Sequence, residues 1–266
     1  MDLQLQGKGA LVTGATRGIG RAIARQLALE GASVVITGRN AETAAAAAAQ
    51  LAEETGARAM GLPLETGDDA SVSALTGRVL SDFGAIDILV NNAARVSGAA
   101  PPPSLAESTG ELFWDDVNVK VVGYIRLARA FAPGMKSRRW GRIINIGGLA
   151  ARRTTAAIWS IRNAAVIALT KNLADELGPF GINVSAIHPG TTRTEATAAL
   201  LERRAGEAGK TAGEIEAALA AATSIGRLVD AEEIAYLAAF LASPKSAAIT
   251  GDVIAAGGGQ KGAIYY

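Results

Sequence analysis

Short, almost continuously apolar runs alternate along the chain with longer stretches rich in alanine, the best helix former. Runs of this kind are typical of strands that are buried on both faces of a parallel sheet. The pattern predicts strands over 10–13, 33–37, 59–64, 86–90, 142–146, 183–187 and 253–255. It predicts helices over 18–30, 40–55, 69–83, 111–132, 155–178 and 230–242. The alternation therefore predicts an α/β fold, with a doubly wound parallel sheet of about seven strands and helices on both faces.

Two segments interrupt this alternation. Residues 95–110, which contain Gly98 and a run of prolines, follow the fourth expected strand, and residues 191–225 form a long, mostly helical insertion after the sixth. Both leave from the carboxyl ends of strands, where ligands bind in doubly wound sheets. We therefore expect both segments to form walls of a substrate site. No repeat or linker divides the chain, so we expect a single domain over residues 1–266.

The composition fits this fold class and excludes several functions. A length of 266 residues suits one α/β domain. Lys and Arg total 26 and Asp and Glu total 25, so the net charge of +1 gives no reason to expect a nucleic-acid partner. Cysteine is absent and His188 is the only histidine, which excludes thiol chemistry and multi-histidine metal sites. We therefore expect a small-molecule substrate and no metal.

The chain also lacks recognisable targeting and membrane segments. Its first residues, Met-Asp-Leu-Gln-Leu-Gln, lack the basic flank and the apolar run of a signal peptide. No stretch approaches the roughly 20 apolar residues that a membrane-spanning helix needs. We therefore expect a cytoplasmic location and no membrane partner.

A glycine-rich turn follows the first expected strand. The segment Thr13-Gly14-Ala15-Thr16-Arg17-Gly18-Ile19-Gly20 has the spacing GxxxGxG and leads into a helix. Glycines let a ligand approach the backbone closely, and the free N–H groups at the start of a helix attract a pyrophosphate. The spacing differs from the GxGxxG of the longer-chain dinucleotide-binding dehydrogenases. The turn is therefore a candidate site for the pyrophosphate of a dinucleotide, with a spacing unlike that of the longer-chain enzymes.

With this turn, the sequence resembles the short-chain dehydrogenase/reductase family. The motifs that carry the resemblance follow the family's order and spacing over residues 7–259. They are the TGxxxGxG turn, Asn91-Asn92-Ala93-Ala94, Asp116-Val117-Asn118-Val119-Lys120, Gly141–Ile146, Pro189-Gly190 and Ile249-Thr250-Gly251. The resemblance implies a Rossmann-type fold and a nicotinamide dinucleotide as cofactor. It is far less specific for the substrate, because this fold hosts many chemistries.

The resemblance also implies three sets of residues around the cofactor. The pyrophosphate would be held by the backbone around Gly14, Thr16, Arg17, Gly18, Ile19 and Gly20. Asn92 and Ala93 would lie near the ribose of the adenosine, and Glu65 would bond the adenine amino group. The nicotinamide and its phosphate would be lined by Ile187, Pro189, Gly190 and Thr194.

The end of the second expected strand distinguishes NAD from NADP. An acid at this place binds the 2′-hydroxyl of the ribose, whereas a cation accommodates a 2′-phosphate. Here the strand ends in Thr37-Gly38-Arg39, and Arg17 lies in the glycine-rich turn. Two guanidinium groups can bind one phosphate in bidentate geometry. We therefore predict NADP(H) as the cofactor.

The positions of the family's catalytic set carry unexpected residues. Family members usually reduce a carbonyl with a Ser, a Tyr, a Lys four residues after the Tyr, and an Asn. Aligned on the flanking motifs, the Ser falls on Gly148, the Tyr on Trp159 and the Lys on Asn163. An indole does not ionise usefully, and an amide neither holds a proton nor lowers a neighbour's pKa. We therefore expect no ordinary interconversion of alcohols and ketones. The three substituted residues would line the pocket, and Asn118 remains as the candidate catalytic residue.

Other ionisable side chains offer no obvious replacement. None of the four tyrosines has a lysine four residues later. Lys120 and Tyr124 are spaced i,i+4 in the preceding helix, and we expect them at the surface or at a subunit interface. His188 titrates near neutrality and is a candidate acid or base. A histidine before Pro-Gly is, however, unremarkable in this family.

Three functions are compatible with an intact cofactor site and a substituted catalytic set. The first is an NADPH-dependent reductase of a substrate that needs no proton donor, such as an imine or iminium ion held against the Trp159 indole. The second is a cyclase, isomerase or lyase without redox chemistry. The third is a non-catalytic NADP-binding protein or partner subunit. We favour the first, because the dinucleotide features are intact and the insertion at 191–225 indicates a real substrate.

The resemblance also implies an oligomer. Family members usually form dimers or tetramers through the two helices that here begin near 111 and 155. The apolar ending Ala263-Ile264-Tyr265-Tyr266 is compatible with burial in such an assembly. We therefore expect a homodimer or a homotetramer.

Overall fold

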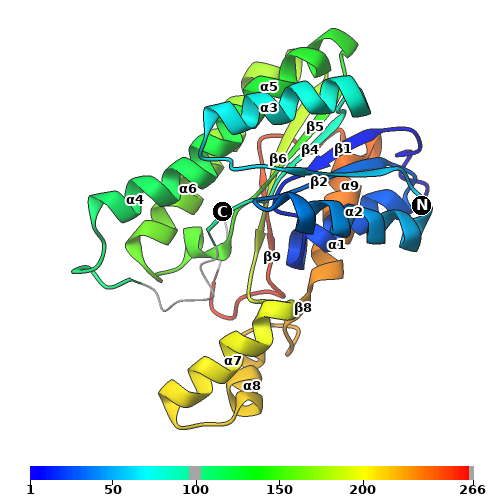
Figure 1. The fold of residues 1–266 in the computed structure, drawn as a ribbon. Helices are drawn as coiled ribbons and strands as arrows, with labels where there is room; N and C mark the ends of the chain where they lie inside the picture. The colour runs from blue at the N-terminus through cyan, green and yellow to red at the C-terminus, as the bar shows by residue number, and fades with distance from the viewer. Residues whose placement is uncertain (96–102, 264–266) are drawn as a thin grey trace.

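Seven parallel strands form the central sheet of the molecule, in the order β3-β2-β1-β4-β5-β6-β9 (Figure 1). The computed structural model describes residues 1–95 and 103–263. The strands are β1 (Gly9–Val12), β2 (Ser33–Gly38), β3 (Ala59–Pro63), β4 (Ile88–Asn91), β5 (Gly141–Ile146), β6 (Ile182–Pro189) and β9 (Val253–Ala256). The order reverses between β1 and β4, and ligands of doubly wound sheets bind at this point. The predicted fold class is confirmed, and every predicted strand overlaps an observed one.

Helices cover both faces of this sheet (Figure 1). They are α1 (Gly18–Leu29), α2 (Ala41–Thr55), α3 (Asp69–Arg78), α4 (Gly110–Val117), α5 (Gly123–Arg138), α6 (Ala157–Leu177), α7 (Glu195–Ala208), α8 (Ala212–Ala221) and α9 (Ala231–Ala242). Ala10 and Val12 of β1 pack with α1, α2 and α9, whereas Leu11 packs with α3, α5 and α6. This two-residue alternation, with burial on both faces, explains why the strands are apolar throughout. None of the described helices is both long and apolar enough to cross a membrane.

The alanine run over 44–49 forms the middle of α2, as predicted. Asn40 begins this helix, because its side-chain oxygen accepts a hydrogen bond from the N–H of Thr43 at 2.9 Å. Small side chains let α2 approach the sheet closely: a Cβ at Gly61 of β3 would lie 2.1 Å from the carbonyl oxygen of Ala44. Alanine in the helix and glycine in the strand therefore set the spacing between them.

The helix predicted over 111–132 is longer than expected and contains a π-helical segment. It comprises α4, the π segment η2 (Asn118–Val122) and α5, which continues to Arg138. The predicted range ends before Pro133, and a proline cannot donate the helical hydrogen bond. Pro133 lies on the exposed side of α5, and Met135 beyond it is fully buried. Packing of the following turn therefore carries the helix past the proline.

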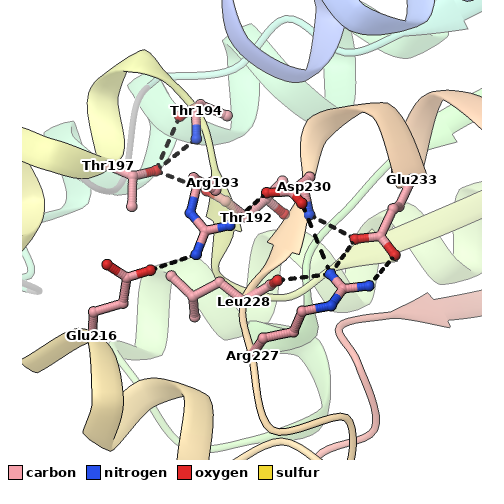
Figure 2. A network of polar contacts seen from close by, with 9 residues as sticks. All are labelled: Thr192, Arg193, Thr194, Thr197, Glu216, Arg227, Leu228, Asp230 and Glu233. Carbon is pink, nitrogen blue, oxygen red and sulfur yellow. Dashed lines mark hydrogen bonds and ion pairs between the residues drawn. The ribbon is translucent and has the colours of Figure 1, made fainter.

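The insertion predicted over 191–225 contains α7 and α8, which lie beyond the carboxyl end of β6 (Figure 1). A short parallel ribbon of β7 (Thr192–Arg193) and β8 (Val229–Asp230), which the sequence pattern did not predict, forms its base. Arg193 pairs with Asp230 at 2.8 Å and with Glu216 of α8 (Figure 2). Across the ribbon, Arg227 pairs with Glu233 of α9 through both terminal nitrogens of its guanidinium group, Nη1 and Nη2 (Figure 2). Ion pairs on both sides of the ribbon therefore fix the base of the insertion.

The second irregular segment, 95–110, is described only in part. Gly98, Pro101 and Pro102 lie outside the described residues, and so do residues 264–266 at the C-terminus. From residue 103 the chain runs through turns into α4. Thr109 begins this helix, because its Oγ1 accepts a hydrogen bond from the N–H of Leu112 at 3.2 Å.

Candidate active site

The glycine-rich turn between β1 and α1 has the shape of a cradle for a pyrophosphate. Gly14 and Gly18 have positive φ angles of 61° and 59°, which glycine adopts without strain. A Cβ at Gly20 would lie 2.5 Å from the carbonyl oxygen of Gly14, so the turn has no room for a side chain there. The first turn of α1 carries no acidic residue, which favours an anion at its positive end. The residues present therefore fit a dinucleotide phosphate.

Hydrogen bonds tie this cradle to the end of β4. The Oγ1 atom of Thr13 accepts the backbone N–H groups of Asn92 at 2.9 Å and of Ala93 at 3.0 Å. The side-chain amide of Asn92 donates in return to the carbonyl oxygens of Thr13 and Gly14, at 2.9 and 3.0 Å. Ala93 lies against Gly14, where a Cβ would be 3.1 Å from its Cα. The amide of Asn92, predicted to lie near the ribose, therefore also holds the cradle in shape.

The cradle contacts the end of β2, where the choice between NAD and NADP is predicted to be made. A Cβ at Gly38 would lie 2.6 Å from the methyl carbon of Thr16. Arg17 directly follows Thr16 and Arg39 directly follows Gly38, so the two arginines leave from neighbouring points of the backbone. Both side chains are exposed, and neither forms an ion pair with a residue that the structure describes. Both guanidinium groups are therefore available to a phosphate.

Two further cofactor candidates lie near this edge. Glu65 lies just after β3. The preceding residue, Leu64, donates its N–H to the carbonyl oxygen of Gly38 at 2.8 Å, which places Glu65 beside the end of β2. The Glu65 carboxylate is exposed and accepts the N–H of Gly67 at 3.2 Å, which leaves it accessible to a ligand. The side chain of Ile19 packs into the core on the α1 side of the sheet, so that only its backbone belongs to the cradle.

The carboxyl end of β6 carries three of the residues that are predicted to line the nicotinamide and its phosphate. Ile187 is buried within the sheet, and Pro189 ends the strand. A Cβ at Gly190 would lie 2.8 Å from the Cα of Gly257, so the chain passes the segment after β9 closely there. This crowding requires glycine at position 190 and sends the chain from β6 toward α7.

The start of α7 lies directly against the cradle. Thr194 begins this helix in a reciprocal cap with Thr197, whose Oγ1 accepts the N–H of Thr194 at 2.8 Å (Figure 2). A Cβ at Gly18 would lie 3.7 Å from the methyl carbon of Thr194. The adjacent Glu195 accepts the backbone N–H of Gly18 at 3.0 Å. A carboxylate therefore occupies a donor that a phosphate oxygen would use, and the only signal for it in the sequence was an acid directly after Thr194.

Asn163 lies beside both Gly148 and the backbone of Trp159, the two other positions of the substituted catalytic set. Trp159 and Asn163 lie one turn apart in α6, and the Nδ2 atom of Asn163 donates to the carbonyl oxygen of Trp159 at 2.8 Å. A Cβ at Gly148 would lie 3.5 Å from the Asn163 amide, an ordinary van der Waals distance. Glycine at position 148 therefore leaves room beside Asn163 for a ligand atom.

Asn118 opens the π segment and bonds to residues outside this group. Its Nδ2 atom donates to the carbonyl oxygen of Gly67 at 2.9 Å, and its Oδ1 atom accepts from Nη1 of Arg126 at 2.9 Å. These bonds tie the irregular helix to the loop after β3. They give Asn118 a structural role beside the catalytic role that the resemblance predicts.

Lys120 and Tyr124 are buried, so the prediction that they lie at the surface or at an interface is wrong. Lys120 is 4% exposed and Tyr124 is 0% exposed. That prediction assumed a regular helix, whereas the π segment changes which side chains face the sheet. The Nζ atom of Lys120 donates to the carbonyl oxygen of Gly147 at 3.1 Å and to Oδ1 of Asn163 at 3.0 Å. The Tyr124 hydroxyl donates to the carbonyl oxygen of Ile146 at 3.0 Å.

Burial shifts the acidity of both groups. The pKa of Lys120 falls to about 7, chiefly because burial disfavours the ammonium form and secondly because Arg162 lies near. Asp116 acts in the opposite direction but pairs with Arg162, and both of these side chains are buried. Burial raises the pKa of Tyr124 well above its usual value. Lys120 therefore changes protonation near neutral pH, whereas the phenol stays protonated.

His188, the only histidine of the sequence, packs against the backbone of Gly147. It is fully buried, and neither ring nitrogen has a hydrogen-bond partner among the described residues. Burial first, and then the charges of Lys120 and Arg152, lower its pKa to about 4. A Cβ at Gly147 would lie 2.3 Å from the imidazole ring, so this position requires glycine. At pH 7 the imidazole is therefore neutral, and its remaining N–H is too weak an acid to protonate a substrate.

The glycine-rich cradle, at the point where the strand order reverses, fits a dinucleotide-binding domain. The chain belongs to the short-chain dehydrogenase/reductase family, since the family model described as "Enoyl-(Acyl carrier protein) reductase" matches residues 14–261. The predicted family is therefore confirmed.

Two relatives that are similar to this chain over almost its full length are named as reductases. The 3-oxoacyl-[acyl-carrier-protein] reductase FabG of Aquifex aeolicus is 35% identical over 263 residues, which cover 98% of this chain and 100% of that protein. The enzyme of the same name from Escherichia coli is 36% identical over 261 residues, with 97% and 99% covered.

Two solved structures are also similar. L-Sorbose reductase from Gluconobacter frateurii, complexed with NADPH and L-sorbose, has a TM-score of 0.92 and 30% identity, over 99% of this chain and 100% of that one. YwfH, an NADPH-dependent reductase involved in bacilysin biosynthesis, has a TM-score of 0.88 and 31% identity, over 97% and 100%.

These relatives overturn the predicted function. The substituted catalytic positions led to three expected functions, namely an imine-type reductase, a non-redox enzyme and a non-catalytic protein. That prediction is wrong, because the full-length relatives are named as reductases of a 3-oxoacyl group and of L-sorbose, which contain ordinary carbonyl groups. The prediction considered His188 as a replacement acid or base but expected Lys120 at the surface or at an interface. The structure brings a buried amine, Lys120, to the same turn from another helix.

Replacing Glu195 by glutamine should strengthen the binding of NADPH. The substitution removes a negative charge from the phosphate-binding end of α1, and an effect of this kind at a helix terminus corresponds to about a two- to fivefold lower Kd. Titration of nicotinamide fluorescence measures the change. Glu202→Gln removes an exposed carboxylate elsewhere on α7, the helix that carries Glu195. It is the matched control and should leave the Kd of NADPH unchanged. Equal or weaker binding by Glu195→Gln would show that this carboxylate does not compete with phosphate.

Proposed function

We propose that this chain is an NADPH-dependent reductase that converts a ketone in a small molecule into a secondary alcohol. The observation that carries the proposal is the complete dinucleotide cradle, closed by the mutual hydrogen bonds of Thr13 and Asn92. The full-length similarity to reductases of ordinary carbonyl groups supports the reaction class. The space beside Gly148 supplies a place for the carbonyl group.

The cofactor is NADP(H), as the sequence predicts. The backbone of the cradle would hold the pyrophosphate, and Arg17 and Arg39 would bind the 2′-phosphate. Two similar solved reductases are described as bound to NADPH or dependent on it, which supports the assignment. When bound, NADPH supplies the hydride for the carbonyl carbon.

The walls of the substrate site would come from the two irregular segments. The α7–α8 insertion starts at the cradle through Thr194 and Glu195, and the ion pairs of the β7–β8 ribbon hold its base. The described part of the other segment, from residue 103 onward, leads into α4. The partly buried Trp159 would add an aromatic wall beside the reacting carbonyl.

We further infer a homodimer or homotetramer that uses α4, α5 and α6. Exposed apolar side chains lie on all three helices. They are Leu112, Trp114, Ile125 and Ile161, with exposures between 39% and 67%. Leu112 and Trp114 also line a groove of about 830 Å³ along α4. Burying such a patch against a second copy removes apolar surface from water.

Ketone reduction is tested by following the absorbance of NADPH with three substrates: a 3-oxoacyl thioester, a ketohexose and a 1,2-diketone. We expect consumption of NADPH above the rate without enzyme for at least one of them, with formation of the corresponding alcohol. NADH should support a lower rate at equal concentration. No consumption of NADPH with any of the three would contradict the proposed function.

Replacing Arg39 by alanine should weaken binding of NADPH but not of NADH. The lost charge-assisted hydrogen bonds to the 2′-phosphate correspond to about a tenfold or greater rise in the Kd of NADPH. Fluorescence titration with each cofactor measures the difference. Arg25→Ala, which removes an exposed arginine paired with Glu54 on α2, is the control and should leave both affinities unchanged. Equal losses for the two cofactors would place Arg39 away from the 2′-phosphate.

Light scattering of the purified chain should give two or four times the subunit mass of 27.0 kDa. Trp114→Glu, which puts a charge on the proposed interface, should lower the measured mass. Leu80→Glu, at an exposed position of the π segment η1 (Val79–Phe83), should not. A monomer at micromolar concentrations would rule out the assembly.

A further inference from the structure

The turn Gly147–Gly148 has a buried lysine beside it that the cofactor cradle does not use. Lys120 reaches this turn from the π segment, with 4% of its surface exposed. A buried ammonium is costly unless it is paired, and perturbed titratable groups of this kind gather at functional sites. The lysine is therefore the strongest candidate for an unassigned chemical role.

Two of the three ammonium protons have fixed partners. They point to the carbonyl oxygen of Gly147 at 3.1 Å and to Oδ1 of Asn163 at 3.0 Å. Asn163 keeps this orientation because its Nδ2 atom donates to the carbonyl oxygen of Trp159 at 2.8 Å. The third proton has no partner among the residues that the structure describes. It is available to a ligand atom beside the turn.

The missing side chain at Gly148 makes room for such an atom. The nearest side chain to a Cβ at this position is Asn163, whose amide oxygen and nitrogen would both lie 3.5 Å away. The same amide oxygen accepts the hydrogen bond of Lys120. A carbonyl oxygen in this space would therefore lie beside the Asn163 amide, whose oxygen is hydrogen-bonded to Lys120.

The charged groups that face Lys120 leave its proton transferable. Asp116, one turn earlier in the helix, is engaged by Arg162 of α6. His188 of β6 is neutral at pH 7, and the Tyr124 hydroxyl is bonded to the backbone. Burial and the charge of Arg162 bring the pKa of Lys120 to about 7. Both the ammonium and the amine are therefore populated near neutral pH.

The other polar groups at the turn are poorer acids. The phenol of Tyr124 has a raised pKa and is turned toward Ile146. His188 is neutral at pH 7, and its remaining N–H is a very weak acid. The indole of Trp159 and the amide of Asn163 do not ionise usefully. Among the described groups around this turn, Lys120 is the one that holds a mobile proton.

We propose that Lys120 donates the proton to the substrate oxygen, in place of the tyrosine that the family usually carries at position 159. The inference rests on the proposed ketone reduction. Hydride from NADPH forms a C–H bond at the carbonyl carbon, the π electrons of the C=O bond move to oxygen, and the oxygen takes a proton from the ammonium group. Lys120 becomes a neutral amine and regains its proton from solvent. One ketone, one NADPH and one proton thus give one alcohol and one NADP⁺.

Lys120→Met tests the donor, because methionine matches the length of the lysine stem but holds no proton. The kcat of ketone reduction should fall by about 10²–10⁴, the contribution typical of one acid–base group. The Kd of NADPH, from fluorescence titration, should stay within about twofold, because the lysine does not touch the cradle. Lys171→Met, at an exposed lysine further along α6, is the matched control and should keep the wild-type rate.

The pH profile separates proton donation from a structural role. For the wild type, kcat/KM of reduction should be level below pH of about 7 and fall above it, because only the ammonium form donates. Lys120→Arg keeps a positive charge but remains protonated far above this range. It should reduce the ketone slowly and without this fall in rate. A lysine with only a structural role would leave the fall unchanged in Lys120→Arg.

The outcomes distinguish this inference from the proposed function. A wild type that reduces ketones, together with a folded Lys120→Met variant that reduces them equally fast, would overturn the role of Lys120 and leave the function standing. A wild type that reduces no ketone would overturn both. Circular dichroism reports whether Lys120→Met is folded. If it is not, the pH profile of Lys120→Arg decides.

Discussion

The hydrogen bonds between Thr13 and Asn92 hold the molecule together at the point where the strand order reverses. Thr13 is fully buried at the end of β1, and its hydroxyl accepts two backbone N–H groups that follow β4. The amide of Asn92 returns two bonds to the backbone of the glycine-rich turn. These contacts fix the donors at the start of α1 before any ligand arrives. A ligand that binds donors already in place costs the protein less conformational entropy. Arg17 and the start of α7 lie at this same glycine-rich turn.

The catalytic side depends on a second constraint, the irregular helix that carries Lys120. The π segment η2 turns this lysine toward the sheet while Asn118 bonds to the loop after β3. Burial of an ammonium is unfavourable, and the hydrogen bonds to Gly147 and Asn163 offset part of that cost. The same burial lowers the pKa of Lys120 into the range where a proton can be both held and released. The π segment therefore links the geometry of the helix to the chemistry of the site.

Local patterns were sufficient to predict the strands and most helices, whereas the residues around the cofactor were implied by the family resemblance. Continuous apolar runs mark strands buried on both faces, and the spacing from Gly14 to Gly20 identifies the turn without any knowledge of its neighbours. Contacts between distant segments were not predictable in this way. Glu195 meets Gly18 across 177 residues, and Lys120 was misplaced because the i,i+4 rule assumes a regular helix. The predicted function was wrong because it was drawn from the substituted positions 148, 159 and 163, whereas the full-length relatives are reductases of ordinary carbonyl groups. The cytoplasmic location and the oligomeric state stay predictions.

The transfer of deuterium from cofactor to substrate tests the central claim most directly. The chain would be incubated with a reducible ketone and NADPH that is deuterated at the reactive carbon of the nicotinamide, and the product would be examined by mass spectrometry. The account predicts an alcohol that carries one deuterium on its carbinol carbon and none on its exchangeable hydroxyl. An alcohol without deuterium, or the absence of any alcohol, would contradict the assignment of this chain as a hydride-transferring ketone reductase.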